Sequence, residues 1–291
     1  MDVNTFLVTV FCIVDDYLKG KQLRSRGPTP TLRDSEVLTM EIVGEFLGFD
    51  KEKHLFLYFR THFAGWFPAL RNIHRTTFTR QMANLCFVKE KLWQHVLGQI
   101  DFDRKISLMD SFPMPVCRFA RAYRCRRLRE VSAFGHDEVA KQTFFGLRVH
   151  LQVCWPGVIV NHRLVAANIH EVEVAEEMLS EAQGWTLGDR NYWNPRVAEE
   201  AKARGLYWLA PYKSAKREPQ PWPRWMKHKR YRIETVIGQL VERFHAKRVW
   251  ARDSWHLLSR WLRKILSHTI AVLLCQQADL PPLQFANLIT R

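Results

Sequence analysis

The fold is decided by residues 105–112, KISLMDSF, a short apolar run that ends in a carboxylate. Residues 144–153, FFGLRVHLQV, alternate apolar and polar side chains, which predicts a half-buried strand. Pro156-Gly157 is a turn signal, and residues 158–165 then return as the hairpin partner. These runs predict three strands in succession, of which the last two form a hairpin.

Helices and strands alternate in the residues that follow. The pattern predicts a helix over 172–182, a strand over 185–189, a helix over 195–204, a fifth strand over 206–210, and helices over 231–249 and 255–277. Three strands followed by two that alternate with helices favour an α/β fold, with a mixed five-stranded sheet and flanking helices. This is the element order of the ribonuclease-H-like fold.

Residues 1–100 carry the apolar periodicity of helices. Apolar side chains recur every three to four residues over 35–47 and over a predicted helix at 76–97. The start of that second helix carries short polar and basic side chains, which suit phosphates and base edges. Its candidate DNA contacts are Arg75, Thr77 and Arg80. We expect a helical DNA-binding region over 1–100, with a possible helix-turn-helix or simply a solvated first turn, and an α/β domain over 101–291.

The chain is strongly basic. Its 291 residues carry a formal net charge of +15, while 47% hydrophobic and 25% charged residues are ordinary for a globular protein. Such a charge points to a polyanionic partner, most often nucleic acid. The alternative is a solvated basic surface without a nucleic-acid partner.

Other classes are excluded by what the sequence lacks. No apolar run reaches the roughly 18 residues that a transmembrane helix needs, and the first residues do not resemble a secretion signal, so we expect a cytoplasmic, nucleoid-associated protein without membrane contact. Six scattered cysteines without a CxxC pair favour neither a zinc site nor disulfides. No GxxxxGKS or GxxxxGKT loop is present, so no nucleotide cofactor is expected.

Three carboxylates fall at predicted element ends. Asp110 closes the first strand, Asp189 closes the fourth, and Glu234 opens the helix after the fifth. Strands one and four are neighbours in a ribonuclease-H-like sheet, so Asp110 and Asp189 would project side by side. Converging carboxylates repel one another unless they bind divalent cations, and hard oxygen ligands favour Mg²⁺ or Mn²⁺. Taken singly, each acid could instead be a turn acceptor or complement a helix dipole.

These acids lie in three motifs that resemble a known family. The stretches MDSFPMPVCRFARAYR (109–124), LGDRNYW (187–193) and RYRIETVIGQLVERF (230–244) are similar to the acidic motifs of DDE transposases from bacterial insertion sequences. The likeness is closest to the group named after insertion sequence 982, whose first motif reads Asp-Ser-Phe-Pro-x-Pro. The resemblance covers nearly the whole chain.

The resemblance implies cleavage and transfer of DNA strands by two divalent metal ions, Mg or Mn, without a covalent enzyme intermediate. By position, Asp110 would bridge both metals, Asp189 would hold one and Glu234 the other. Water would attack first, and the freed 3′-hydroxyl would then attack target DNA. The implied partners are double-stranded DNA, as transposon ends and as target, and a second copy of the chain in a homodimer.

The sequence also departs from the family. Many relatives have Lys or Arg, then Gly and Tyr, after the second acid, whereas this chain has Arg190-Asn191-Tyr192. Some DDE families carry a Lys seven residues after the Glu, whereas position 241 is Val. The phosphate-clamping roles of that signature therefore do not carry over to this chain.

Basic and aromatic residues surround the three motifs. Residues 118–129 are rich in arginine, and residues 213–230 form a predicted basic loop with several Pro and Trp. Arg suits bidentate phosphate contacts, while the alternatives are a solvated charge run and Trp side chains that pack the loop down. The further candidate DNA contacts are Arg118, Arg121, Arg124, Arg126, Arg127, Arg190, Trp193, Lys227, Arg230, Arg232, Arg243 and Lys247.

Three functions are compatible with these features. The resemblance implies a DNA transposase with a helical DNA-binding region followed by a ribonuclease-H-like DDE domain. A second possibility is another two-metal nuclease or resolvase on the same fold. A third, from a different class, is a sequence-specific DNA-binding protein without catalysis.

Overall fold

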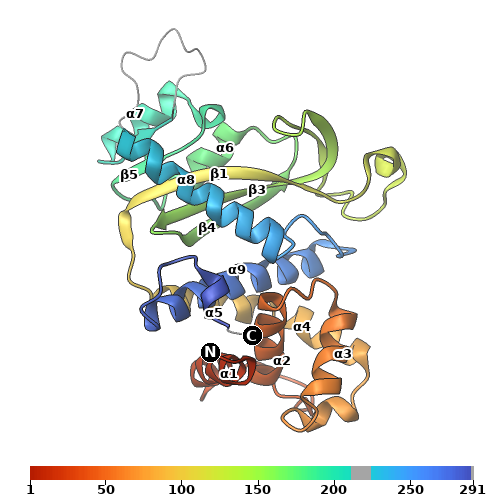
Figure 1. Cartoon of the computed structure of the whole chain (residues 1–291). Coiled ribbons are helices and arrows are strands. Elements are labelled where there is room, and N and C mark those ends of the chain that lie inside the picture. Colours follow the sequence, from red (N-terminus) through yellow and green to blue (C-terminus); the bar gives the residue numbers. More distant parts are fainter. Residues whose placement is uncertain (211–223, 290–291) are drawn as a thin grey trace. The chain divides into compact units, whose positions relative to one another are not determined.

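The computed structural model describes residues 1–210 and 224–289 (Figure 1). Packing divides the chain into two compact units. The helical unit comprises Met1–Ile100, Leu240–Ala246 and Trp250–Arg291, and the sheet unit comprises Asp101–Gln239 and Lys247–Val249. The sequence had assigned everything after residue 100 to one domain. In the structure the chain instead returns to the helical unit near its end.

The helical unit is built around its longest helix. Its helices are α1 (Val3–Leu18), α2 (Asp34–Phe46), α3 (Glu52–His62), α4 (Arg75–Asn84), α5 (Cys86–Leu97) and α9 (Ser254–Gln277). Helix α9 packs against α2, α4 and α5 and is buried along most of its length. The apolar core of this unit is therefore formed by residues that lie more than 150 positions apart in the chain.

The predicted single helix over 76–97 is wrong. It is two helices, α4 and α5, joined at Leu85, whose backbone ψ of 13° departs from the value near −42° of a regular helix. Leu85 is buried, so apolar periodicity continues through the break. No Gly or Pro marks the position, and the sequence therefore carried no signal for it.

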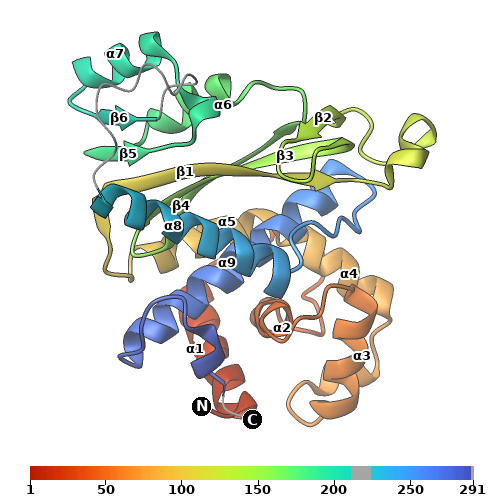
Figure 2. The same cartoon turned by 45° about the horizontal axis from the view of Figure 1, so that its top comes forward.

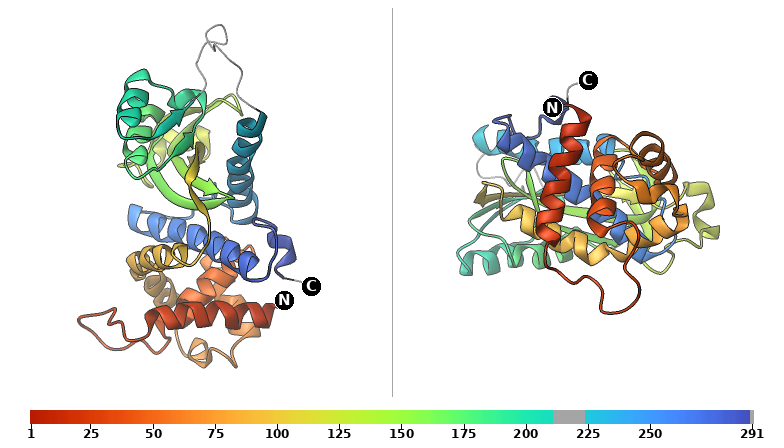
Figure 3. Two further views of the ribbon diagram at one scale, coloured as in Figure 1. Left: turned by 90° about the vertical axis from the view of Figure 1, so that its left-hand side faces the viewer. Right: turned by 90° about the horizontal axis from the view of Figure 1, so that it is seen from below.

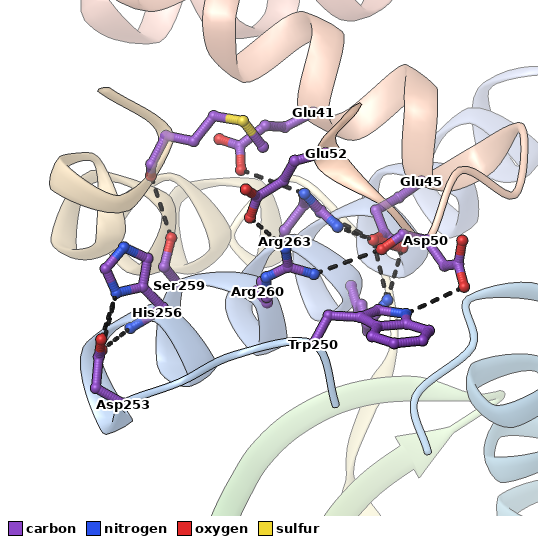
Figure 4. A network of polar contacts seen from close by, with 12 residues as sticks. Glu41, Glu45, Asp50, Glu52, Trp250, Asp253, His256, Ser259, Arg260 and Arg263 are labelled. Carbon is purple, nitrogen blue, oxygen red and sulfur yellow. Dashed lines mark hydrogen bonds and ion pairs between the residues drawn. The ribbon is translucent and has the colours of Figure 1, made fainter. Parts of the chain in front are cut away.

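A network of buried charges lies inside the helical unit (Figure 4). Glu45 on α2 accepts hydrogen bonds from Arg263 Nε at 2.8 Å and from Lys264 Nζ at 2.9 Å, both on α9. Lys89 on α5 donates to Glu41 at 2.8 Å and to the Ser259 hydroxyl at 2.7 Å. Because these side chains are almost wholly removed from water, the ion pairs fix how α2, α5 and α9 meet.

The sheet unit contains a mixed sheet. Its strands are β1 (Asp103–Pro115), β2 (Ala133–Asp137), β3 (Gln142–Trp155), β4 (Val158–Ala166), β5 (Trp185–Leu187) and β6 (Tyr207–Leu209). They follow the order β2-β3-β1-β5-β6, and β4 also pairs with β3. Strand β1 runs antiparallel to β3 and parallel to β5, which runs parallel to β6.

The five-stranded prediction is wrong by one strand, since the described residues form six. The missed strand is β2, which has the sequence AFGHD. It contains Gly135 and two polar residues and is only half-buried, so it lacks the apolar alternation that marks a strand. Gly135 lies close to Ala167, because a Cβ added at position 135 would be 2.6 Å from the Ala167 carbonyl oxygen.

Helices cover both faces of the sheet. Figures 2 and 3 show α6 (Glu171–Leu179) and α7 (Pro195–Ala203) on one face and α8 (Arg224–Gly238) on the other. Helix α7 begins as predicted, because the Asn194 side chain accepts a hydrogen bond from the Arg196 amide at 2.9 Å. The cluster between α6, α7 and the sheet includes Met109, Met178 and Trp208.

The structure also changes the predicted start of α8. The sequence predicted a basic loop over 213–230 and a helix over 231–249. Helix α8 instead begins at Arg224 and ends at Gly238, and a π-helical turn, η5 (Gln239–Arg243), follows. Residues 211–223 of the predicted loop lie outside the described residues.

Among the helices of the described ranges, none has both the length and the apolar character that crossing a membrane requires.

Candidate active site

Asp110 and Asp189 occupy matching positions relative to the neighbouring parallel strands β1 and β5. Leu108 of β1 pairs with Leu187 of β5, and each aspartate lies two residues further along its chain. Because side chains alternate along a strand, Asp110 lies on the same face as Leu108. Asp110 does not close its strand as predicted, since β1 continues to Pro115. Asp189 follows the end of β5 and leads into the 3₁₀ turn η3 (Arg190–Tyr192).

Asp110 is a half-buried acid that forms no direct ion pair with a described residue, although the charge of Arg230 acts on it and lowers its pKa. Its Oδ1 accepts a hydrogen bond from the Ser111 backbone N–H at 2.7 Å. Burial raises the pKa of Asp110 to about 7; the Ser111 hydrogen bond opposes this shift, and the negative charge of Asp189 adds to it. A bound cation would stabilise the ionised form of Asp110, which burial disfavours.

Asp189 has a different partner. Arg230 of α8 donates to Asp189 Oδ1 at 2.8 Å, and the two side chains are 31% and 32% exposed. Arg230 had been predicted as a DNA contact. Its guanidinium is held at the candidate site, where it neutralises the second acid.

Glu234 does not join the two aspartates. It lies on α8 one helical turn after Arg230 and is exposed. Within residues 1–210 and 224–289, no three His, Cys, Asp or Glu side chains come together in a way that could hold a metal ion. The structure therefore brings Asp110 and Asp189 together and leaves Glu234 apart.

A third carboxylate that the sequence analysis missed lies beside Asp110. Glu171, the first residue of α6, accepts hydrogen bonds from the Ser111 hydroxyl at 2.7 Å and from Arg148 of β3 at 2.8 Å. Its negative charge contributes to the raised pKa of Asp110, after burial and Asp189. The only sequence signal was a glutamate immediately before the helix predicted over 172–182, where an acid usually complements the helix dipole.

The Asp189 turn is anchored by a buried pair. The Tyr192 hydroxyl and Nδ1 of His150 lie 2.7 Å apart, and His150 is opposite Ser111 in the β1–β3 register. Burial lowers the pKa of His150 to about 3, and the nearby Arg148 charge acts in the same direction. His150 is therefore neutral at physiological pH and acts here as a hydrogen-bonding partner of Tyr192.

The arginine-rich segment 118–129 is mostly exposed. It contains a 3₁₀ turn, η2 (Phe119–Arg124), and its exposed arginines include Arg118, Arg121, Arg124 and Arg126. Arg127 is half-buried and donates to the Val116 carbonyl at 3.1 Å, so part of its hydrogen-bonding capacity is used within the fold. The exposed rings of Phe119 and Tyr123 contact Phe134 of β2, which supports the turn.

The remaining predicted DNA contacts are dispersed. Arg75, Thr77 and Arg80 are exposed on α4, and Lys247 is also exposed. Arg232 lies 5.0 Å from the Trp155 ring, Arg243 lies 4.1 Å from the Phe46 ring, and Trp193 is half-buried. Arg190 belongs to η3 and Lys227 to α8, but their side chains are outside the described part of the structure.

Comparisons with known proteins identify the sheet unit. The family described as "Transposase DDE domain" matches residues 101–249. No curated protein sequence matches the chain. A solved piggyBac transposase synaptic complex with hairpin DNA is similar over 99% of this chain and 79% of that chain, with a TM-score of 0.48 and 10% identity. Because the family match spans half of the sequence and begins where the sheet unit begins, the chain belongs to the DDE transposase domain family and is a DNA transposase.

Proposed function

We propose that Asp110, Asp189 and Glu234 are the acids with which this transposase cleaves transposon ends and transfers the freed strand into target DNA. The observation that carries the proposal is the matched placement of Asp110 and Asp189, two residues beyond the paired Leu108 and Leu187. Asp110 has no ion-pair partner among the described residues, and burial raises its pKa to about 7. This combination supports a cation-binding role.

The strand order supports a ribonuclease-H-like assignment for the sheet unit. Without β2, the strands follow β4-β3-β1-β5-β6, with β1, β5 and β6 parallel and β3 antiparallel to β1. In the ribonuclease-H-like arrangement expected from the sequence, the first and fourth strands are neighbours. When β2 is left out of the count, β1 is the first strand and β5 is the fourth. Asp110 lies on β1, and Asp189 follows the end of β5.

The donor set fits a divalent cation. DDE transposases depend on divalent metal ions, and Mg²⁺ is usually held by one or two carboxylates together with waters and substrate phosphates. Asp110 and Asp189 supply two such carboxylates, and Glu234 would supply the third if α8 brought it to the pair. We propose Mg or Mn, with two ions in the active complex, which would supply an activated nucleophile and charge stabilisation at the phosphate.

Other residues of the chain would bind and orient DNA. The exposed arginines of 118–129 follow β1 directly, and guanidinium groups make bidentate contacts with phosphates. Arg75, Thr77 and Arg80, near the start of α4, would contact the backbone through the helical unit. We also propose Arg190, Trp193, Lys227, Arg232, Arg243 and Lys247 as further contacts, with Arg230 shared between DNA and Asp189.

The finer classification and assembly also belong to the proposal. The DSFPMP motif supports membership of the insertion-sequence-982 group. Joining two transposon ends requires two active sites, which supports a homodimer in the active complex. A net charge of +15 supports association with the bacterial nucleoid.

The proposal is tested by cleavage and strand transfer on labelled transposon-end DNA with Mg²⁺ or Mn²⁺. Asp110→Asn, Asp189→Asn and Glu234→Gln should each lose more activity than the roughly 10–100-fold that changes around a metal site cause, while DNA binding is retained. Two matched controls are Asp103→Asn, an exposed aspartate on the same strand, and Glu242→Gln, an exposed glutamate in η5. Full activity of any one of the three variants would remove that acid from the site.

A further inference from the structure

Ser111 connects Asp110 to a second carboxylate. Its backbone N–H donates to Asp110 Oδ1 at 2.7 Å, and its hydroxyl donates to Glu171 Oε1 at 2.7 Å. One residue therefore contacts the candidate metal-binding acid through its backbone and Glu171 through its side chain. The Glu171 contact is therefore made by the same residue whose backbone hydrogen-bonds the Asp110 carboxylate.

Glu171 is itself held by an ion pair. Arg148 donates to Glu171 Oε1 at 2.8 Å and, through its other terminal nitrogen, to the His136 carbonyl at 2.7 Å. The side chains of Arg148 and Glu171 are 16% and 11% exposed, so water screens the pair poorly. The network joins β1, β2, β3 and the start of α6, and it holds Arg148 in a fixed position.

The charges around Asp110 nearly cancel. Asp110, Asp189 and Glu171 contribute three negative charges, and Arg148 and Arg230 contribute two positive charges. Arg148 also lies close to the Asp110 strand, because its Nη1 is 3.4 Å from the Ser111 hydroxyl. Loss of the Glu171 charge would leave Arg148 without its counter-charge next to Ser111, the neighbour of Asp110, where it would oppose a bound cation.

We infer that Glu171 is a positioning residue, which neutralises Arg148 and orients Ser111 so that the Asp110 carboxylate stays available to a divalent cation. The inference rests on the proposed function, in which Asp110 binds the metal. In this scheme Glu171 acts through Oε1, which accepts two hydrogen bonds from the protein, and not as a metal ligand. Partners of this kind fix the orientation and charge of the ligands that they surround.

The test is Mn²⁺ binding to the full-length protein without DNA, measured by the electron paramagnetic resonance of the free ion. Glu171→Gln should weaken Mn²⁺ binding by about 10–100-fold. The matched control is Glu177→Gln on the same helix, where Glu177 pairs with Arg163 at 2.7 Å but is largely exposed. The control should change the affinity less than about 2-fold. Equal affinities of the two variants would overturn the inference.

A second pair of variants separates positioning from ligation. Glu171→Gln combined with Arg148→Gln removes both members of the ion pair, so Mn²⁺ binding should return to within a few-fold of the wild type. If Glu171 were a direct ligand, the double variant would remain as weak as the single one, and the inference would fail.

Variants of Ser111 supply a readout that is less exposed to misfolding. Ser111→Thr keeps the hydroxyl and should bind Mn²⁺ like the wild type, whereas Ser111→Ala loses the hydrogen bond to Glu171 and should bind more weakly. Equal affinity of Ser111→Ala and the wild type would contradict the orienting role of the hydroxyl.

The same titration separates this inference from the proposed function. Asp110→Asn should abolish the site. If Asp110→Asn binds Mn²⁺ as well as the wild type, the proposed metal-binding acids are wrong. If Asp110→Asn loses the ion while Glu171→Gln behaves like Glu177→Gln, the acids stand and only the role of Glu171 is rejected.

Discussion

Both units bury carboxylates, but the pKa of Glu45 in the helical unit and the pKa of Asp110 in the sheet unit shift in opposite directions. In the helical unit, burial alone would raise the pKa of Glu45, but the charges of Arg263 and Lys264 hold it below its ordinary value. In the sheet unit, burial raises the pKa of Asp110 to about 7, and no described residue pairs with it. Glu45 is held in a completed cluster of direct ion pairs, whereas Asp110 forms no direct ion pair with a described residue and has Arg230 only nearby.

This difference in pairing separates charges that hold the fold together from charges that take part in the reaction. A buried pair is costly to break but does not by itself add much stability, because both charges have lost their hydration. An unpaired buried acid lowers stability until a cation binds, which is a common property of active sites. The two units therefore predict opposite responses to the removal of a carboxylate.

The largest expected effect follows from breaking the completed cluster. Glu45→Ala leaves Arg263 and Lys264 buried without their shared partner, and should reduce the free energy of unfolding by about 3–5 kcal/mol. Urea denaturation measures this change. Glu90→Ala, an exposed glutamate on α5, is the control and should cost less than about 0.5 kcal/mol. Similar losses in both variants would contradict the structural role of the cluster.

Removing the unpaired acid, Asp110, should instead increase the free energy of unfolding. The pKa of Asp110 is raised from 3.8 to about 7, so its contribution to stability is present below pH 4 and is lost as the pH rises through 7. Asp110→Asn cannot ionise and should be more stable than the wild type by about 1–3 kcal/mol at pH 8 in EDTA, given the partial exposure of the site. The gain should shrink as the pH falls towards 4. A variant less stable at pH 8 would contradict the raised pKa.

An intermediate effect is expected at Arg230, which neutralises the second acid. Arg230→Gln removes a positive charge from the site and should tighten Mn²⁺ binding by about 5-fold, or about 1 kcal/mol. This is opposite in sign to the effect of Glu171→Gln. The free-ion titration used for Glu171 measures it, and Arg232→Gln on the same helix is the control. Weaker binding by Arg230→Gln would show that the arginine supports the site.

The smallest effect is expected at the exposed pair of Arg163 and Glu177. The two side chains are 32% and 59% exposed, and surface pairs contribute little because water screens them. Glu177→Gln should change the free energy of unfolding by less than about 0.5 kcal/mol in the same urea assay. A loss near that of Glu45→Ala would show that burial does not distinguish the two kinds of ion pair.

Local patterns in the sequence were sufficient for much of the sheet unit. Alternating side chains and the Pro156-Gly157 turn predicted the β3–β4 hairpin, and the helix predicted from residue 195 matches the start of α7. The first two candidate acids were chosen because each follows a short apolar run. These features depend on interactions between residues that are close in sequence.

The features that were missed depend on tertiary contacts. Strand β2 has little apolar alternation and is held by its pairing with β3. The role proposed for Glu171 arises only because the fold brings α6 beside Ser111 and Arg148, which lie 60 and 23 residues away. Likewise, nothing around Arg230 indicates that it reaches Asp189, 41 residues earlier. Such pairings are not visible in one sequence.

The return of the chain to the helical unit has a consequence for biosynthesis. Glu45 and its partner Arg263 are separated by 218 residues. At translation rates of about 5–20 residues per second, the ribosome needs about 10–40 s to reach Arg263 after it has made Glu45. During that interval the ribosome makes the whole sheet unit, while the first hundred residues lack the helix that completes their core. We expect the nascent sheet to fold first, and a premature stop before α9 to leave the earlier helices as a target for chaperones and proteases.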